Sequence, residues 1–252
     1  MYTLKKSLGQ HFLKDEAISQ RIADTIGSCT PELKQLLEVG PGAGALTRYL
    51  LRLEGLDFKL VELDEEKVDY LLKTYPSLSG KIITGSILEV PVPFDGDFTV
   101  IGNFPYNIST QIVFRMLEWR EQIECMIGMF QKEVAVRICA GPGSKDYGIL
   151  SVLTQAYFQA NYLFDVDEEA FNPPPKVKSG VISLSRTGNP FGISNHRRFA
   201  ALVKAAFGQR RKQLRNPLKP YFKPEVLKED IFTKRAEQLS VADYVGLLNK
   251  MQ

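Results

Sequence analysis

The sequence contains few cysteines, and their positions exclude two kinds of stabilised small domain. Among 252 residues there are three, Cys29, Cys125 and Cys139, and none belongs to a CxxC pair. An odd number of scattered cysteines predicts neither a disulfide framework nor a zinc site, and it favours a reducing, cytoplasmic setting. We therefore expect a protein that holds no metal.

Long hydrophobic runs are also missing. The N-terminal segment MYTLKKSLGQHFLKDE has no apolar run behind Lys5 and Lys6, so it does not resemble a secretory signal. The longest uncharged stretch, 147–164, contains scattered Ser, Thr, Gln and Asn residues. This stretch predicts a buried helix rather than a membrane span. With 44% hydrophobic and 24% charged residues, the composition is that of an ordinary globular protein.

Acidic residues are absent from a long basic segment near the C-terminus. Between Ala170 and Pro224 there are twelve Lys and Arg residues and no Asp or Glu, although the net charge of the chain is only +3. Such a segment predicts a polyanionic partner, most commonly nucleic acid, and the alternative is a solvated helix face. The cations that we expect to contact RNA are Lys176, Lys178, Arg197, Arg198, Lys204, Arg210, Arg211, Lys212 and Arg215.

Short apolar runs alternate with segments of helical spacing in the first half of the chain. Strands are expected at 35–39, 58–63, 81–84, 98–101 and 125–130, and helices at 45–54, 65–74 and 109–119. This alternation predicts an α/β fold, with a parallel sheet that carries helices on both faces. Further along, the pattern predicts helices at 131–140 and 148–160 and edge strands at 162–166 and 177–184.

The pattern changes after Arg186. The segment TGNPFGISN is rich in Gly, Pro and Asn and predicts a linker. Beyond it, helical spacing recurs without alternating strands, at 197–207, 210–218, 224–227 and 241–250. We therefore predict one α/β domain at 1–186 and a small all-helical, RNA-contacting domain at 187–252.

A glycine-rich turn follows the first expected strand, in the segment LLEVGPGAGALTRYL. Gly40, Gly42 and Gly44 permit a tight turn and let a flat ligand approach the carboxyl end of the strand. Glu62, about twenty residues later at the end of the next strand, can hold ribose hydroxyls. The motif also fits a dinucleotide fingerprint, which leaves a nicotinamide-dependent oxidoreductase open. Glu38 and the glycine spacing look more like a class I S-adenosylmethionine-dependent methyltransferase.

The segment Asn103-Phe104-Pro105-Tyr106 follows the fourth expected strand. Adenine N6 is a poor nucleophile because its lone pair is delocalised into the ring. The Asn103 side-chain oxygen and the Phe104 carbonyl, held still by Pro105, can accept both N6 hydrogens and aim the lone pair at a methyl group. Tyr106 is expected to stack on the base. A loop turn with a buried tyrosine is the alternative.

Two further segments are expected to border the same site. Residues 10–13 precede a helix that Asp15 caps, so they can fold over a ligand as a lid. We expect His11 to hydrogen-bond cofactor or substrate rather than to act as a general base. Phe171 precedes three prolines, and this rigid loop can present its ring to a base across from Tyr106. The alternative is a ring that packs against the proline-rich turn.

Eight motifs occur in one order along the chain: GQHFL, EVGPGAGALT, VELD, GNFPYNIST, QKEVAVRI, YGILSV, FNPPPKVKSGV and FGQRRKQLRNPL. Together they resemble the ribosomal RNA adenine dimethyltransferase family, and most closely its small-subunit type. The resemblance implies a class I, Rossmann-like methyltransferase domain, a small helical domain and S-adenosylmethionine as the methyl donor. It implies dimethylation of N6 on two adjacent adenosines in the 3′-terminal hairpin of 16S rRNA, within a small ribosomal subunit precursor. We expect a cytoplasmic monomer with no membrane partner.

Matching motif positions carry the family's site onto this chain. They place His11 and Leu13 at the lid, Glu62 on the ribose and Asn103 between cofactor and adenine. The cofactor-binding set that we expect is Gln10, His11, Leu13, Glu38, Gly40, Gly42, Gly44, Glu62, Leu63, Ser86, Ile87 and Asn103. Ser86 stands where the family commonly has an acidic residue, and His11 where Asn is more usual. Loss of the charge-assisted bond at Ser86 is expected to cost about 1 kcal/mol of cofactor affinity.

Two other functions fit part of the sequence. A related macrolide-resistance methyltransferase would act on large-subunit rRNA, but the FNPPPKVKSGV loop and the FGQRRKQLRN segment argue against it. A non-catalytic nucleic-acid-binding factor on the same fold is the second. The intact glycine turn and the NFPY segment disfavour such a factor.

Overall fold

The computed structural model describes residues 11–30 and 32–252. It divides into two compact units: Met1–Ala135 with Asn161–Arg186, and Val136–Ala160 with Thr187–Gln252. One boundary coincides with the expected linker after Arg186, but residues 136–160 group with the C-terminal helices. The reason is that α7 (Ile149–Gln155) packs against α8 (His196–Phe207).

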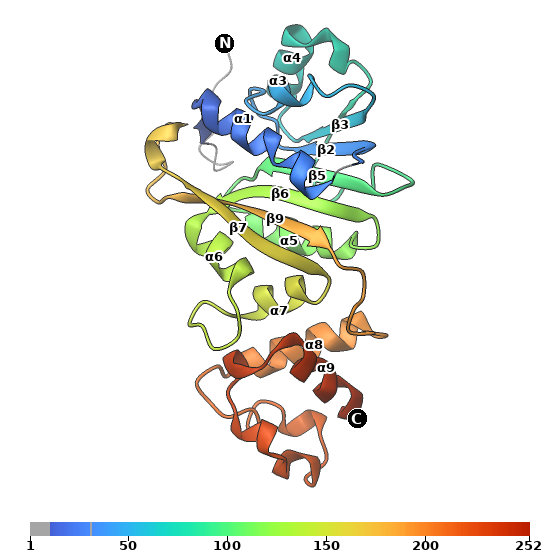
Figure 1. Ribbon diagram of the computed structural model, residues 1–252, viewed down its shortest axis with the longest axis vertical. Coiled ribbons are helices and arrows are strands. Elements are labelled where there is room, and N and C mark those ends of the chain that lie inside the picture. Colours follow the sequence, from blue (N-terminus) through green and yellow to red (C-terminus); the bar gives the residue numbers. More distant parts are fainter. Residues whose placement is uncertain (1–10, 31) are drawn as a thin grey trace. The chain divides into compact units, whose positions relative to one another are not determined.

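A seven-stranded sheet forms the framework of the first unit (Figure 1), in the order β4-β3-β2-β5-β6-β9-β7. The strands are β2 (Gln35–Val39), β3 (Asp57–Glu62), β4 (Ile82–Thr84), β5 (Phe98–Asn103), β6 (Ile123–Gln131), β7 (Phe158–Val166) and β9 (Ser179–Arg186). Neighbours from β4 to β6 are parallel, and β9 runs antiparallel to β6. The central strands are buried almost along their whole length, because helices cover both faces of such a sheet.

Helices α1 (Glu16–Asp24) and α5 (Ser109–Glu118) lie on opposite faces of the sheet in Figure 1. The other helices that begin in this unit are α2 (Ile26–Cys29), α3 (Thr47–Leu50), α4 (Glu65–Thr74) and α6 (Lys132–Cys139). The expected cap of α1 is confirmed, since the Asp15 carboxylate accepts a hydrogen bond from the Ile18 amide at 3.1 Å. The predicted α/β class is confirmed as well, and the sheet is mostly parallel, with β9 antiparallel to β6.

The order of the strands determines where a ligand can bind. From β2 the chain moves outward through β3 to β4, and then returns to add β5 on the other side of β2. The carboxyl ends of β2 and β5 therefore lie side by side at the point where the strand order reverses. Open α/β sheets bind ligands in the crevice at this point.

Four expected helices differ from the structure, and the one expected at 224–227 is only a turn followed by the 3-10 helix η5 (Val226–Lys228). The one expected at 45–54 contains only the four-residue α3, within a series of turns. The uncharged stretch expected to be one helix at 148–160 is instead α7 followed by β7, because an apolar run alone does not distinguish buried helix from buried strand. No helix forms at 210–218, since the Leu214 amide bonds to the Lys234 carbonyl and Gln213 pairs with Arg235.

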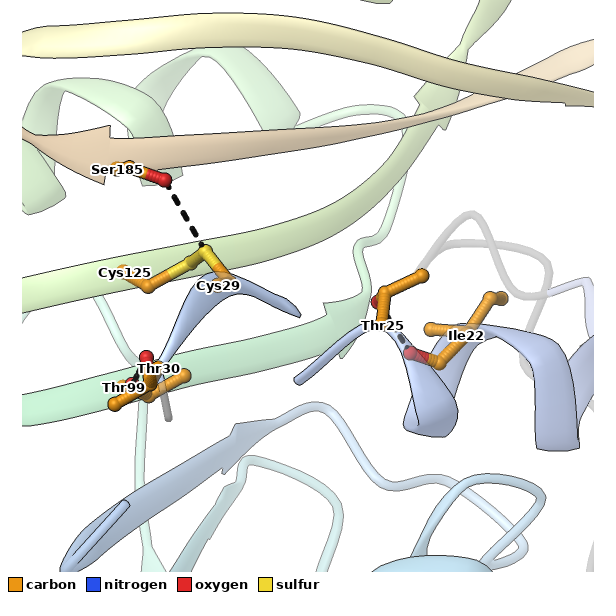
Figure 2. Close-up of a disulfide and its surroundings, with 7 residues drawn as sticks. All are labelled: Ile22, Thr25, Cys29, Thr30, Thr99, Cys125 and Ser185. Atoms are coloured by element: carbon orange, nitrogen blue, oxygen red, sulfur yellow. Dashed lines mark hydrogen bonds between the residues drawn. A yellow bond between two sulfur atoms is a disulfide. The ribbon is translucent and has the colours of Figure 1, made fainter. Parts of the chain in front are cut away.

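A disulfide joins Cys29, at the end of α2, to Cys125 on β6 (Figure 2). The expectation of no disulfide was therefore wrong. The two Cα atoms are 6.1 Å apart although 96 positions separate them in sequence, so only the packing of α2 against the sheet brings them together. The Cys29 sulfur also lies 3.4 Å from the Ser185 hydroxyl, while Cys139 is free.

The second unit is built around α8 and α9 (Val241–Lys250). Asn195 caps α8 through the Arg198 amide, and Ser240 caps α9 through the Asp243 amide. The Phe207 ring lies between the rings of Tyr147 and Tyr244, at centroid distances of 6.4 Å and 6.2 Å. Four short 3-10 turns, η4 (Lys219–Tyr221), η5 (Val226–Lys228), η6 (Asp230–Thr233) and η7 (Ala236–Gln238), connect these helices.

Candidate active site

A pocket lies at the carboxyl ends of β2, β3 and β5, within the first unit. The lid, the glycine turn, the end of β3 and the segment after β5 all contribute to its wall. Expected residues that line it are His11, Leu13, Glu38, Gly40, Gly42, Glu62, Leu63, Ser86, Ile87, Asn103, Phe104, Pro105 and Tyr106. Gln10 lies outside the described residues. Gly44 and Phe171 lie elsewhere in the first unit.

The glycine turn joins the pocket to β3. Gly40 and Gly42 have positive φ values of 67° and 58°, which residues with side chains rarely adopt. The Gly42 amide donates to Oε2 of Glu62 at 3.1 Å. A Cβ atom on Gly44 would lie 3.0 Å from the Tyr75 ring, so Gly44 permits close packing against α4 rather than contact with a ligand.

Two buried glutamates lie in the wall of the pocket. Glu62 is 7% exposed, and its Oε1 accepts from the Asp64 amide at 3.0 Å. Glu38 is 1% exposed and accepts a hydrogen bond of 2.7 Å from the Thr47 hydroxyl. Burial raises the pKa of Glu38 to about 8, against the lowering effect of the Thr47 bond, and the nearby Glu62 charge raises it further. Glu38 is therefore a neutral acid at neutral pH.

Replacing Glu38 by Gln tests this protonation state. An unfolded Glu loses its proton near its ordinary pKa of 4.5, whereas folded Glu38 keeps it to about 8. The folded state thus binds more protons, and the free energy of unfolding should fall as pH rises between these values, by on the order of 4 kcal/mol. Glu38→Gln should remove that fall and exceed the wild type in stability at pH 8.5. Urea denaturation at pH 6 and pH 8.5, between which about 2 to 3 kcal/mol of that fall should occur, measures the difference.

The exposed Glu133 provides the control for this experiment. Glu133→Gln removes one carboxylate from the surface and should keep the pH dependence of the wild type. If Glu38→Gln also keeps it, Glu38 is ionised in the folded protein and the assignment is wrong.

The segment after β5 connects the pocket to the lid. The Asn103 amide nitrogen donates to the His11 carbonyl at 3.3 Å. The Tyr106 hydroxyl lies 2.5 Å from the Ser179 hydroxyl, and its ring stacks on the His11 imidazole at a centroid distance of 5.5 Å. Burial raises the Tyr106 pKa, so the hydroxyl stays protonated. A flat ring at stacking distance thus already rests against Tyr106.

The lid is tied to the proline-rich loop. Strand β1 (Phe12–Leu13) pairs antiparallel with β8 (Phe171–Asn172), and the His11 Nδ1 donates to the Pro173 carbonyl at 2.9 Å. The Phe171 side chain is 1% exposed and belongs to the hydrophobic core. It therefore does not present its ring across from Tyr106, as we expected, because β8 directs it inward. Exposure of a side chain is not visible in a sequence.

Lys67 is a pocket residue that the sequence did not reveal. It lies on α4, is 3% exposed, and its Nζ atom is 5.0 Å from the centre of the Phe12 ring. A lysine on a helix is usually exposed to solvent, so its residue type alone did not predict that Lys67 lines the pocket. The available signal was helical spacing, since Lys67 and the buried Leu71 are four positions apart on one face of α4.

The expected RNA-contacting cations fall into two groups. Three have partners within their own unit: Lys178 pairs with Asp167 at 2.6 Å, Arg198 donates to the Met251 and Gln252 carbonyls, and Arg210 donates to the Lys145 carbonyl at 2.6 Å. Exposure does not separate these three from the rest, since Lys178 and Arg198 are exposed, as are Lys176, Arg197, Lys204, Arg211, Lys212 and Arg215. Lys176 and Lys178 belong to the first unit and the rest to the second.

Residues 11–30 and 32–252 contain no group of three or more His, Cys, Asp or Glu side chains placed to hold a metal ion. In that same part of the chain no helix is long and apolar enough to cross a membrane.

The sheet order, the glycine turn after β2, the acidic residue at the end of β3 and the NFPY segment after β5 define a class I methyltransferase. Solved structures agree on the fold. A dimethyladenosine transferase from Plasmodium falciparum superposes with a TM-score of 0.79 at 24% identity, covering 96% of this chain and 99% of that one. The 23S rRNA methyltransferase ErmE gives 0.73 at 24% identity, covering 95% and 99%.

Similar sequences identify the family, whereas the solved structures show the fold alone. Residues 1–252 match the family described as ribosomal RNA adenine dimethylase. The Parabacteroides distasonis protein named ribosomal RNA small subunit methyltransferase A is 51% identical, covering 96% of this chain and 92% of that one. The protein of the same name from Flavobacterium johnsoniae is also 51% identical, covering 98% and 95%. The chain belongs to the ribosomal RNA adenine dimethylase family, and the predicted resemblance is confirmed.

Proposed function

We propose that this protein dimethylates N6 of two adjacent adenosines in the 3′-terminal hairpin of 16S rRNA, within a precursor of the small ribosomal subunit. It does so as a cytoplasmic monomer, with S-adenosylmethionine as methyl donor and no metal. The observation that carries the proposal is the meeting of Asn103, Tyr106 and the glycine turn in one pocket. The names of the relatives that are 51% identical support the small subunit as the source of the RNA.

The pocket has the groups that this methyl donor requires. The Glu62 carboxylate retains lone pairs beyond the bonds from Gly42 and Asp64, and these can accept ribose hydroxyls. Leu63 and Ile87 offer an apolar surface to a purine, and the Ser86 hydroxyl can accept from its amino group. The positive φ at Gly40 and Gly42 leaves the carboxyl end of β2 open to a close approach. The bound donor supplies an electrophilic methyl group.

The segment after β5 provides the chemistry on the substrate side. The bond from the Asn103 amide nitrogen to the lid leaves the Oδ1 end of the amide to accept from adenine N6. The Phe104 carbonyl accepts the second hydrogen, so the nitrogen lone pair is directed toward the methyl group. Tyr106 stacks on the base, as it does on His11. The lost proton passes to water, and no covalent intermediate with the enzyme forms.

The decisive experiment uses labelled S-adenosylmethionine and small ribosomal subunits from cells that lack the modification. The expected result is incorporation of four methyl groups per subunit, mapped to two neighbouring adenosines of the 3′-terminal hairpin. Large subunits treated in parallel serve as the control. Methylation of large subunits instead, or of neither, would overturn the proposal.

A further inference from the structure

A pair of glycines lies under the proposed substrate segment. Gly102 on β5 and Gly128 on β6 are direct partners in the parallel register, so their missing side chains belong to the same face of the sheet. Both are buried, and they stand at the centre of the sheet. Glycine weakens a strand interior and often marks a place where another group approaches closely.

The group that approaches is the Phe104 ring. A Cβ atom built on Gly102 would lie 2.7 Å from its Cε1 atom. One built on Gly128 would lie 3.0 Å from Cδ2 and closer still to Cε2. The two opposite edges of the ring thus rest on the two glycines, and the side chain is 1% exposed. Phe130 packs against it at a centroid distance of 5.1 Å.

The two glycines differ in the atoms that a Cβ would meet besides the Phe104 ring. At Gly102 a Cβ atom would also lie 2.6 Å from the Val39 carbonyl oxygen, so the backbone itself requires glycine there. At Gly128 the neighbours are rings: Phe104, and Phe130 at 2.5 Å from its Cε2 atom. The three atoms nearest to a Cβ at position 128 therefore all belong to aromatic rings, whereas at Gly102 the nearest is a backbone oxygen.

We propose that Gly128 is a positioning residue for methyl transfer: its missing side chain lets the Phe104 ring lie flat on the sheet, which fixes the Asn103 amide and the Phe104 carbonyl. The inference rests on the proposed roles of those two acceptors. Phe104 carries one acceptor on its own backbone and is bonded directly to Asn103. Its amide also donates to the Met129 carbonyl at 3.2 Å, so ring and backbone are anchored together.

The size of the effect follows from the geometry. Ordinary contact requires 3.4–4 Å, so an alanine at position 128 would displace the Phe104 ring by about 1 Å. A misplacement of about 1 Å in a reacting group costs on the order of 100-fold in rate. The cofactor side of the pocket is built from the lid, the ends of β2 and β3 and the segment after β4, and no residue of β6 lines the pocket.

Four variants test this inference: Gly128→Ala, Phe104→Leu, and Gly128→Ala combined with either Phe104→Leu or Phe130→Leu. We expect Gly128→Ala to lower kcat by about 10- to 100-fold, with the Kd for S-adenosylmethionine and the KM for small subunits within about threefold. Adding Phe104→Leu should return kcat toward the value of Phe104→Leu alone, because the smaller side chain relieves the crowding at residue 104, which carries the acceptor. Adding Phe130→Leu to Gly128→Ala should leave kcat at the low value of Gly128→Ala.

Three results would overturn the inference: an unchanged kcat in Gly128→Ala, an equal loss of cofactor affinity, or rescue by Phe130→Leu instead. If Gly128→Ala does not fold, Phe104→Leu alone tests the inference. The smaller side chain leaves part of the space above the two glycines empty, so kcat should fall while the affinity for the cofactor is kept. A kcat equal to that of the wild type would contradict the inference. Failure of the wild type to methylate small subunits is a separate result, because it refutes the proposed function and not the packing of Phe104 on Gly128.

Discussion

Replacing Asn103 by alanine is expected to reduce methyl transfer by at least about 100-fold, because the substrate nitrogen loses the acceptor that orients its lone pair. The affinities for S-adenosylmethionine and for small subunits should stay within about threefold, since neither depends chiefly on this amide. Single-turnover rates with labelled donor, together with calorimetric Kd values, separate the two effects.

Asn103→Asp and Asn161→Ala complete this experiment. The aspartate keeps an acceptor oxygen but cannot donate to the His11 carbonyl, so it should retain more activity than the alanine variant. Asn161 is an exposed asparagine on β7, outside the pocket, and its replacement by alanine should leave the rate unchanged. Turnover of Asn103→Ala within about tenfold of the wild type would contradict the proposed role.

The sequence predicted the elements that hydrophobic pattern alone determines. Strand β2 at 35–39 and helix α4 at 65–74 occur where expected, because central strands are apolar on both faces and α4 has a cap and regular spacing. The hydrophobic pattern was insufficient where hydrogen bonds to backbone groups distant in sequence determined the local structure. At 210–218, the bonds of Leu214 and Gln213 to residues 234 and 235 replace a helix, and no local property of the segment encodes those partners.

The candidate site was also predictable only in part, because some of its features depend on contacts between residues that are distant in sequence. Motifs located Gly40, Glu62 and Asn103, because each lies at or directly after the carboxyl end of a strand, and the strands of a parallel sheet end together. They could not show that Phe171 is buried or that Gly44 serves packing. The disulfide between Cys29 and Cys125 likewise depends on packing across 96 positions.

The basic segment illustrates the difference between charge in sequence and charge in space. Arg186 pairs with Asp97, Lys178 with Asp167, and Arg210 approaches Glu237 at 3.9 Å, so acids from other parts of the chain neutralise some of it. Arg210 also donates to carbonyls of the 141–147 segment, including Ser144 at 3.4 Å. Its guanidinium therefore has hydrogen-bond acceptors within the second unit, while the side chain stays 40% exposed.

Arg211, Lys212 and Arg215 are the cations of this segment that should dominate RNA binding, since they are exposed and close in sequence. Replacing all three by alanine is expected to weaken binding of 16S rRNA by about 100-fold at moderate salt. Each phosphate contact contributes about 0.7 to 0.9 to the slope of log K against log salt, so that slope should flatten by about 2. Filter binding or fluorescence anisotropy across a salt series measures both.

Two controls distinguish a phosphate contact from loss of charge or of structure. Alanine at the exposed Lys34, Arg52 and Lys73 of the first unit removes the same net charge and should leave the salt slope within about 0.5 of the wild type. Arg210→Ala should instead lower the Tm of the protein while the slope at low temperature is kept, because its hydrogen bonds are internal. An unchanged slope in the triple variant would exclude these residues from the RNA interface. A flattened slope in Arg210→Ala, with Tm unaltered, would show that Arg210 contacts RNA directly.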